Sequence, residues 1–264
     1  MPKKLLIIIP AYNEAQNILS VLNEIERTGV KQFADVLVIN DASSDNTNLL
    51  VKKRNYALVT HIYNLGYGSA LQLGYKYAVR RRYQFVVQMD ADGQHDVCNI
   101  SKLYRELQTP DESGRLPDIV LGSRFVKGAA PFPVSRAKKA AFALFRTMIR
   151  MVTGKKIMDP TTGLQGLSWP AFLYYSKYNH FDDKYPDANM IMQMLLLGFQ
   201  IREIPAVMHA RASGRSMHSG LKPICYMLHM FFSTLAVVFR IKVLKTGIEV
   251  FGRQEDFTSF SLKN

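Results

Sequence analysis

Short apolar runs alternate with helix-like segments over the first 122 residues, and this alternation restricts the possible folds more than any other feature. Strands are predicted at the apolar or β-branched runs 4–9, 35–39, 57–62, 84–89 and 118–122. Helices are predicted near 14–28, 45–54 and 68–81. Continuous apolar strands that alternate with helices are typical of a mostly parallel central sheet flanked by helices on both faces. We therefore expect an α/β fold that binds ligands at the carboxyl ends of its strands.

Composition and cysteine spacing narrow the class of protein. A chain of 264 residues that is 48% hydrophobic and 21% charged is typical of a folded globular protein with a large core. Cys98 and Cys225 lie far apart without C-x-x-C spacing, which indicates neither a disulfide framework nor a zinc site and favours a reducing cytosol. The apolar run Leu5 to Ile9 follows two lysines but is too short for a signal peptide, so we interpret it as a strand.

The net charge of +13 is concentrated in the C-terminal half. Residues 1–120 contain 14 Lys and Arg against 13 Asp and Glu, whereas residues 121–264 contain 20 against 8. A basic half of this kind suits nucleic acid, an anionic membrane or a phosphorylated substrate, and a merely solvated basic face is the alternative. Because nothing resembles an aromatic stacking module or a recognition helix, we expect no nucleic-acid partner.

Polar side chains follow three of the predicted strands. In chain order these are Asn13 and Glu14, then Asp41, Ser44 and Asp45, then Asp90 and Asp92. For Asn13, Ser44 and Asp45, helix capping explains the residue type equally well. The pair Asp90 and Asp92 is harder to explain by capping, and it directs attention to the end of the fourth strand.

Asp90 and Asp92 form a candidate metal site. Two neighbouring carboxylates repel each other unless a cation lies between them. A hard ion such as Mg²⁺ or Mn²⁺, which keeps some waters and takes phosphate oxygens, suits this number of ligands. Gln94 and His95 lie close by, and Gln94 is the preferred additional ligand, whereas Asp96 is expected to cap the following helix. Two solvent-facing turn aspartates are the alternative for this tripeptide alone.

Six motifs occur along roughly residues 4–216: "IIIPAYNE", "VINDASSDNT", "NLGYGSALQLGY", "QMDADGQHD", "GSRF" and "DPTTGLQG". Their order and spacing resemble the inverting glycosyltransferases of family two, in particular the dolichyl- and polyprenyl-phosphate sugar synthases. The resemblance implies the GT-A fold, a nucleotide-sugar donor and a divalent cation. The glycines follow G-x-G-x-x-x-x-x-G and not G-x-G-x-x-G, so a dinucleotide-binding site is only weakly indicated.

The resemblance also implies roles for individual residues. The expected donor-binding set is Pro10, Tyr12, Glu14, Asp41, Gly68, Asp90 and Ala91, and the expected metal ligands are Asp90, Asp92 and Gln94. The expected acceptor or phosphate-binding set is Arg124, Arg136, Asp159, Arg211 and Ser216. The expected catalytic set is Asp92, Arg124, Asp187 and Arg211. Gly68 belongs to a turn that lets the backbone pass close to the nucleotide, and residues 127–140 are predicted to form a mobile loop over the site.

Asp187 keeps two interpretations. In relatives that glycosylate a hydroxyl, a carboxylate in this region takes the proton of the acceptor, and Asp187 resembles that base. It also suits the first turn of a helix over 188–197, where the helix dipole stabilises a negative charge. A lipid phosphate acceptor is already ionised near neutral pH and needs arginines more than it needs a base.

The C-terminal segment bears on the location of the protein. Residues 223–239 are apolar with few polar interruptions and have basic residues on both sides, but seventeen residues fall short of the ~20 that cross a bilayer. An interfacial amphipathic helix on the cytoplasmic face of the cell membrane fits better, and a buried core or dimer-interface helix is the alternative. We expect a GT-A domain over 1–216, membrane-contacting or interface helices over 217–250 and a polar tail over 251–264.

These features together predict transfer of a sugar from a nucleotide-sugar to an undecaprenyl or dolichyl phosphate, with Mg²⁺ or Mn²⁺, for cell-envelope glycan or glycoconjugate synthesis. Expected partners are the donor, the lipid acceptor, an anionic membrane surface and a homo-oligomer or membrane protein. Two alternatives stay open. One is an enzyme that elongates a saccharide with Asp187 as base, and the other is an idle nucleotide-sugar-binding scaffold.

Overall fold

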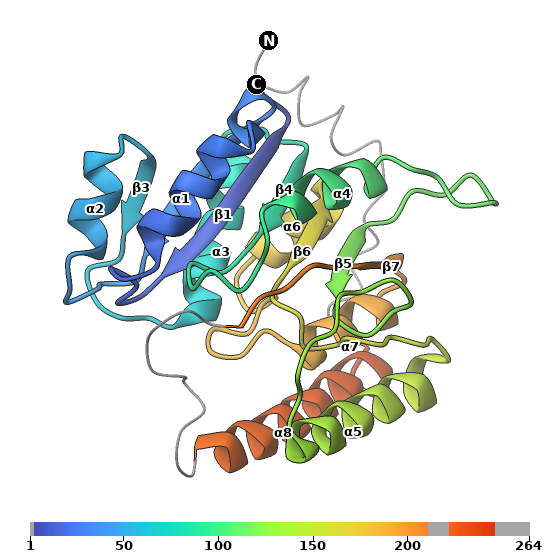
Figure 1. The fold of residues 1–264 in the computed structure, drawn as a ribbon. Helices are drawn as coiled ribbons and strands as arrows, with labels where there is room; N and C mark the ends of the chain where they lie inside the picture. The colour runs from blue at the N-terminus through green and yellow to red at the C-terminus, as the bar shows by residue number, and fades with distance from the viewer. Residues whose placement is uncertain (1–2, 211–221, 246–264) are drawn as a thin grey trace.

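A seven-stranded sheet forms the centre of the computed structural model, which describes residues 3–210 and 222–245 (Figure 1). The strand order is β3-β2-β1-β4-β6-β5-β7. The strands are β1 (Leu5–Ala11), β2 (Ala34–Asn40), β3 (Ala57–Thr60), β4 (Phe85–Gln88), β5 (Ile119–Ser123), β6 (Gln165–Ser168) and β7 (Ile201–Pro205). Only β6 runs antiparallel to its neighbours β4 and β5, so the expected mostly parallel α/β sheet of the GT-A fold is confirmed.

Nine helical segments surround the sheet in the described part of the chain. They are α1 (Ile18–Arg27), η1 (Val30–Gln32), α2 (Thr47–Lys53), α3 (Tyr67–Arg80), α4 (Cys98–Glu106), α5 (Arg136–Thr153), α6 (Trp169–Ser176), α7 (Ala188–Leu196) and α8 (Lys222–Lys242). Successive side chains of a strand point to opposite faces, which divides the core in two. Leu5 and Ile7 pack with α1 and α4, whereas Leu6 and Ile8 pack with α3 and α6 on the opposite face.

The predicted strands and helices agree with the structure except at their ends. The strand predicted over 57–62 ends at Thr60, because its neighbour β2 ends at Asn40 and the chain then turns. The first helix begins at Ile18, since the carbonyl oxygen of Glu14 accepts the backbone N–H groups of Asn17 and Ile18 in a preceding turn.

The loop predicted over 127–140 is shorter in the structure, because residues 136–140 form the first turns of α5. Ser135 caps this helix, with its hydroxyl accepting the backbone N–H of Lys138 at 3.4 Å. The buried residues Phe142, Phe145 and Ile149 follow at helical spacing, and this spacing gives α5 an apolar face toward the domain.

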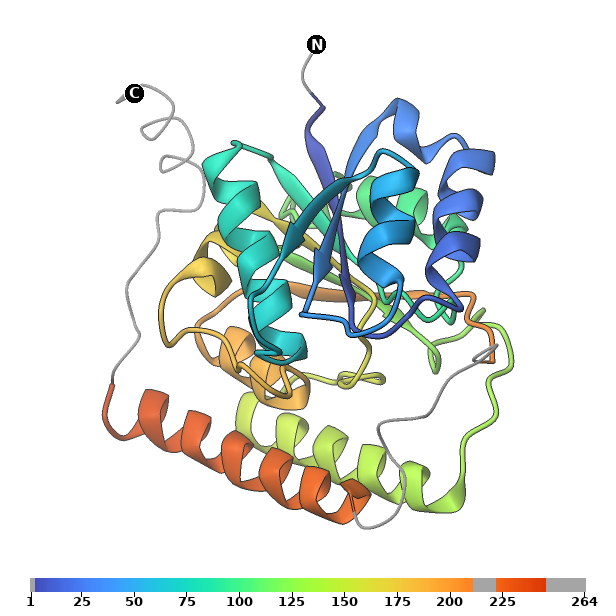
Figure 2. The same ribbon diagram turned by 90° about the vertical axis from the view of Figure 1, so that its left-hand side faces the viewer.

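Helices α5 and α8 lie side by side as an outer layer below the sheet, and α7 lies between this layer and the sheet (Figures 1 and 2). Met230, Val237 and Ile241 of α8 are buried in the same core as α5 and α7. Within 3–210 and 222–245, no helix is long and apolar enough to cross a membrane. The predicted boundary between 216 and 217 lies outside the described residues.

Candidate functional site

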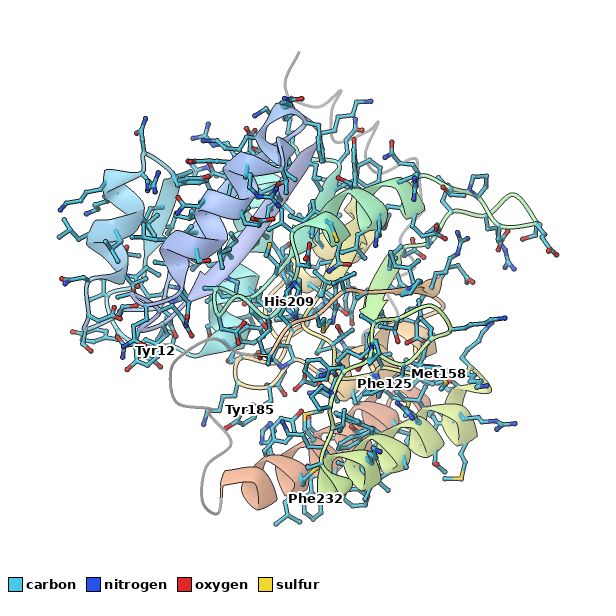
Figure 3. The ribbon with its side chains drawn as sticks, viewed as in Figure 1. Tyr12, Phe125, Met158, Tyr185, His209 and Phe232 are labelled. Atoms are coloured by element: carbon cyan, nitrogen blue, oxygen red, sulfur yellow. The ribbon has the colours of Figure 1, made fainter. Side chains whose placement is uncertain are left out.

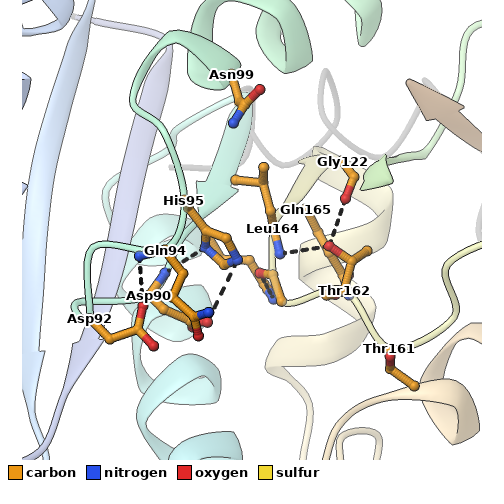
Figure 4. A network of polar contacts seen from close by, with 12 residues as sticks. Asp90, Asp92, Gln94, His95, Asn99, Gly122, Thr161, Thr162, Leu164 and Gln165 are labelled. Atoms are coloured by element: carbon orange, nitrogen blue, oxygen red, sulfur yellow. Dashed lines mark hydrogen bonds and ion pairs between the residues drawn. The ribbon is translucent and has the colours of Figure 1, made fainter. Parts of the chain in front are cut away.

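Asp90 follows β4 at the carboxyl edge of the sheet and has contacts on several sides. The hydroxyl of Tyr67 donates to Asp90 Oδ1 at 2.9 Å. The backbone N–H of Asp90 donates to His95 Nδ1 at 3.0 Å, and His95 Nε2 lies 3.7 Å from Asp90 Oδ2 (Figure 4). Because Nδ1 accepts, the neutral ring carries its proton on Nε2, which faces the carboxylate. A Cβ on Gly163 would lie 3.2 Å from Asp90 Oδ2, so the backbone of Gly163 packs closely against the Asp90 carboxylate.

Asp92 and Gln94 are held by backbone contacts beside Asp90. Asp92 Oδ1 accepts the backbone N–H of Gln94 at 3.0 Å (Figure 4). Gln94 Nε2 donates to the carbonyl oxygen of His209 at 3.4 Å. Asp96 accepts the N–H of Cys98 at 2.8 Å, as a residue at the start of α4 should, and also contacts His209. Gln94 thus has a side-chain contact of its own, and its role as a metal ligand stays a prediction.

The carboxylates at this edge suit a cation whose remaining ligands are oxygens of the substrate. Among the residues that the structure describes, no three His, Cys, Asp or Glu side chains gather as a metal-binding group. Mg²⁺ is commonly held by one or two carboxylates together with phosphate oxygens and water, and Mn²⁺ favours the same oxygen ligands. Asp90 and Asp92 match that pattern, since both are carboxylates at the end of one strand.

The loops that follow β1 and β2 are tied to each other. Asn13, at a positive φ of 54°, accepts the N–H of Ser44 at 2.9 Å, and its own N–H donates to the Ser43 hydroxyl. Asp45 accepts the N–H groups of Ala15 at 3.0 Å and Thr47 at 2.9 Å. Asp45 therefore does cap α2 in addition to joining the loops, whereas Asn13 joins the loops and caps no helix.

Four predicted donor-binding residues lie in β1 or follow β1 or β4. Pro10 is buried within β1, Tyr12 is 49% exposed, and the backbone N–H of Glu14 donates to Thr47 Oγ1 at 2.9 Å. Ala91 is buried between the two aspartates. Figure 3 shows Tyr12 at the tip of its loop, at the end of the sheet. An exposed aromatic ring on a rigid loop suits stacking against a base.

Asp41 is buried and supports the turn before α3. Its two carboxylate oxygens accept the backbone N–H groups of Leu65 at 2.9 Å and Gly66 at 2.8 Å, and His61 Nδ1 lies 2.7 Å from Oδ1. These contacts shape the glycine turn directly. Its predicted contact with a base or ribose stays a prediction.

Gly68 permits a close approach between two parts of the protein chain. A Cβ at this position would lie 1.9 Å from the carbonyl oxygen of Asp182, and the N–H of Ser69 donates to the carbonyl oxygen of Asp183 at 3.0 Å. The space beside Gly68 is thus filled by residues 182–183. The predicted close approach of this glycine to the nucleotide stays a prediction.

Arg124 follows β5 and forms an ion pair with Asp159. Its Nη2 lies 2.6 Å from Asp159 Oδ1, and its Nε and backbone N–H both donate to Oδ2 at 2.8 Å. Asp159 is completely buried, and the rings of Phe125 and Phe142 lie 5.3 Å from the Arg124 guanidinium carbon. Among the described residues these contacts use Nε and Nη2, which leaves Nη1 available for a phosphate oxygen.

Asp187 lies at the start of α7, but its side chain does not cap the helix. Its Oδ2 accepts the hydroxyl of Tyr226 from α8 at 2.6 Å. Burial raises the pKa of Asp187 to about 6, a shift that the Tyr226 hydrogen bond opposes. The carboxylate of Asp90 also raises this pKa and the Arg124 guanidinium lowers it. The structure thus brings Asp187 to the same site as Asp90 and Arg124.

Four residues of this site were not predicted from the sequence: Tyr67, Gly163, Glu203 and Tyr226. Glu203 accepts the backbone N–H groups of Met158 at 2.7 Å and Asp159 at 2.8 Å, which positions the partner of Arg124. Tyr67 and Gly163 lie inside recognised motifs, so each had a signal, whereas Glu203 follows the charged Arg202 in the strand IREIP and does not stand out in the sequence. Tyr226 had none.

Three predicted phosphate-binding residues were not observed in full. Arg211 and Ser216 lie outside the described residues, and Arg136 is the first residue of α5 but its side chain lies outside the description too. Their roles stay predictions.

Comparison with known proteins places this site in a family. Undecaprenyl-phosphate mannosyltransferase of Micrococcus luteus is 28% identical over 82% of this chain and 88% of its own length. Polyprenol monophosphomannose synthase of Mycolicibacterium smegmatis is 30% identical over 61% of this chain and 60% of its own. The chain spans less than two thirds of several curated relatives that it matches, 66%, 63% and 60% in three cases.

A solved structure shows the same fold. Glucosyl-3-phosphoglycerate synthase from Mycobacterium tuberculosis, crystallised with Mn²⁺, UDP and glucosyl-3-phosphoglycerate, superimposes with a TM-score of 0.63 at 17% identity, over 90% of this chain and 79% of that one. The family model described as glycosyl transferase family 2 matches residues 6–174, well over half of the sequence. The chain therefore belongs to glycosyl transferase family 2 and has the GT-A fold.

Proposed function

We propose that the protein transfers a hexose from a nucleotide-diphospho-sugar to a polyprenyl phosphate at the cytoplasmic face of a membrane, with inversion at the anomeric carbon. The observation that carries this proposal is the position of α8. On one side of α8, the Tyr226 hydroxyl donates a hydrogen bond to Asp187 of the site. On another side, α8 exposes the apolar residues Leu228, Phe232, Leu235 and Phe239. A site that adjoins an exposed apolar row suits an acceptor with a lipid tail. The two relatives described above are named for such acceptors.

The outer layer of α5 and α8 has the composition of a membrane-contacting surface. The four exposed apolar residues recur at intervals of 4, 3 and 4, so they form one row along α8, and Phe232 points away from the sheet (Figure 3). Exposed Lys138, Lys139 and Arg150 lie on α5 beside it. An apolar row next to cations binds anionic lipid headgroups and acyl chains together.

The residues at the carboxyl edge suit the chemistry of the donor. Breaking the bond between the anomeric carbon and the diphosphate adds negative charge to the leaving group. A divalent cation held by Asp90 and Asp92 would supply the positive charge that stabilises it. Side chains of the protein position the substrates for the transfer. Arg124, fixed by Asp159, directs a phosphate of the substrate, and the ionised acceptor phosphate attacks without transferring a proton.

Asp187 has a defined part in this scheme. It accepts hydrogen bonds from hydroxyls of the transferred sugar and takes no proton. Its raised pKa of about 6 favours the second candidate, in which a saccharide hydroxyl attacks and Asp187 is the base. The variant Asp187→Asn separates the two. A positioned base contributes about 10²–10⁴-fold, so a loss of about tenfold or less with lipid phosphate contradicts the base role.

The experiment that tests the proposal is a donor and acceptor screen with the full chain. Several UDP- and GDP-sugars are combined with undecaprenyl or dolichyl phosphate in vesicles, with Mn²⁺, Mg²⁺ or EDTA. We expect a glycosyl-phosphoryl lipid of inverted configuration, identified by mass spectrometry and NMR, only when a metal is present. Asp90→Asn and Asp92→Asn should each lower turnover by about 10²-fold or more. Asp111→Asn, an equal change on an exposed loop, should have no effect.

Three results would redirect the proposal. Product formed only with saccharide acceptors would establish the elongating enzyme. Nucleotide binding without release of nucleotide from any donor, with and without lipid, would support the idle scaffold. Binding of a second copy or a membrane protein to the apolar row would appear as a change of oligomeric state without vesicle binding.

A further inference from the structure

The segment 181–187 is the last part of the connection from α6 to α7. It lies between α8 and the start of α3 at residues 66–69, which we call the donor turn. On the donor side, its backbone fills the space beside Gly68, and Asp183 accepts the N–H of Ser69. The next residue toward the site, Tyr67, donates its hydroxyl to Asp90. A displacement of residues 182–183 therefore acts directly on the turn that holds Asp90.

On the other side, the same segment is held by polar residues of α8. Asp182 Oδ2 accepts Asn189 Nδ2 at 2.8 Å and lies 3.6 Å from His229 Nε2. Asn189 Nδ2 also donates to the Ser233 hydroxyl at 2.8 Å. Near the site, the Tyr226 hydroxyl donates to Asp187. Residues 226, 229 and 233 recur at helical spacing, so one face of α8 carries all three contacts.

The Tyr226 contact is well packed. The rings of Tyr226 and Tyr185 meet edge to face with centroids 5.2 Å apart, and His229 lies at the same distance from Tyr185. Asp187 is held from a second direction as well, because its backbone N–H donates to Asn189 Oδ1 at 2.9 Å. Helix α8 thus fixes the carboxylate at position 187 through Tyr226, and Asn189 of α7, which itself contacts Ser233 of α8, fixes the main chain.

We propose that Tyr226 is a positioning residue for sugar transfer: it holds the Asp187 carboxylate toward the substrate and, with His229 and Ser233, braces the segment 181–187 against the donor turn. This inference rests on the proposed function for its activity readout. The helix that carries the apolar row is then also a structural part of the active site.

The first test is a double-mutant cycle in the full chain. Tyr226→Phe removes one oxygen and keeps the ring, so it should lower kcat about fivefold and leave the KM of the nucleotide-sugar within about twofold. In the Asp187→Asn background, the same substitution should change kcat by less than about 1.5-fold, because Tyr226 acts through the carboxylate. Tyr178→Phe, a matched change at an exposed tyrosine, should leave kcat unchanged. Equal fold-losses in both backgrounds would overturn the inference.

The second test does not depend on activity. Hydrogen exchange of the Asp187 and Ser69 amides, which donate to Asn189 and Asp183, should be at least about tenfold faster in Tyr226→Phe than in the parent, with exchange in β1 unchanged. Unchanged exchange at both amides would refute the brace. If the parent transfers sugar from no donor, the proposed function fails while this test still decides the inference.

Discussion

In the ion pair of Arg124 and Asp159, loss of a single side chain would leave a buried charge without its counterion. Asp159 is completely buried. Three N–H groups of Arg124 donate to its carboxylate, and Glu203 accepts its backbone N–H. Removing one partner of a buried pair leaves the other charge uncompensated, which costs far more than the pair contributes. The pair thus holds the guanidinium in a fixed position, as the proposed contact with a substrate phosphate requires.

We expect Asp159→Asn to lower the free energy of unfolding by about 3–5 kcal/mol, because the Arg124 charge loses its counterion. Urea denaturation of Asp159→Asn and of the exposed control Asp111→Asn measures this change. A loss no larger than that of the control would show that solvent already balances the Arg124 charge.

Asp187 gives a pH-dependent prediction with a definite sign. Its pKa is about 6 in the folded protein against an ordinary value of 3.8, so the folded state binds the proton more tightly than the unfolded state. The contribution to stability is complete below about pH 4 and is lost as pH rises through about 6. Since Asp187 is only partly shielded from solvent, the loss is about 1–2 kcal/mol and not the full value of the shift.

Asp187→Asn should therefore be more stable than the parent at pH 8 by about 1–2 kcal/mol and no more stable at pH 4. The measurement is urea denaturation at both pH values in EDTA, which keeps the protein free of metal. A stability difference that does not change with pH would mean that Asp187 does not titrate in this range.

At the scale of elements, the backbone of residues 182–183 packs directly against Gly68 of α3 and leaves no room for a side chain there. Gly68→Ala adds a Cβ 1.9 Å from a backbone oxygen that cannot rotate away. Helix propensity favours alanine by about 1 kcal/mol, but the clash should outweigh it and leave a net loss of about 1–3 kcal/mol. Ser69→Ala, one residue further along α3, adds no atom and serves as the control in thermal denaturation. A stabilised Gly68→Ala variant would contradict the contact.

The sequence predicts a strand or helix well where its own residues form a clear apolar pattern. The first five strands and the position of Asp90 and Asp92 follow from apolar runs and the residue after each run. The strand β6 was not predicted, because Gln165–Ser168 is short and contains a glycine and two polar residues. Since β6 runs against its neighbours, the segment before it, with Asp159 and Gly163, reaches the carboxyl edge. A search limited to residues after strands does not find that segment without the family resemblance.

Contacts between distant segments set the limit of sequence-based prediction. Gly68 was assigned to the glycine turn, but it is the second residue of α3, and its neighbour, the carbonyl oxygen of Asp182, lies more than 100 residues away in the sequence. Tyr226 lies on an apolar helix where nothing distinguishes its hydroxyl from that of any other tyrosine. Its role depends on the packing of α8 against α7, which no local pattern encodes.

At the scale of the whole molecule, the outer layer predicts membrane binding. Phe232 is 63% and Phe239 is 54% exposed, and burying each ring in lipid contributes about 1.5–3 kcal/mol. The double variant Phe232→Ser and Phe239→Ser should reduce co-sedimentation with phosphatidylglycerol-containing vesicles at least about tenfold. Tyr178→Ser, at an exposed aromatic residue elsewhere, is the matched control. Equal sedimentation of both variants would rule out this row as the lipid contact.

The packing of α8 has a practical consequence for purification. Met230, Val237 and Ile241 of this helix belong to the core that α5 and α7 share. A chain shortened before α8 in order to avoid detergent would expose that core and aggregate. Replacement of the exposed apolar row of α8 by polar residues removes the exposed hydrophobic surface. It leaves the buried face of the helix unchanged. Under the proposed function, such a variant should transfer sugar without detergent to acceptors with short, water-soluble tails.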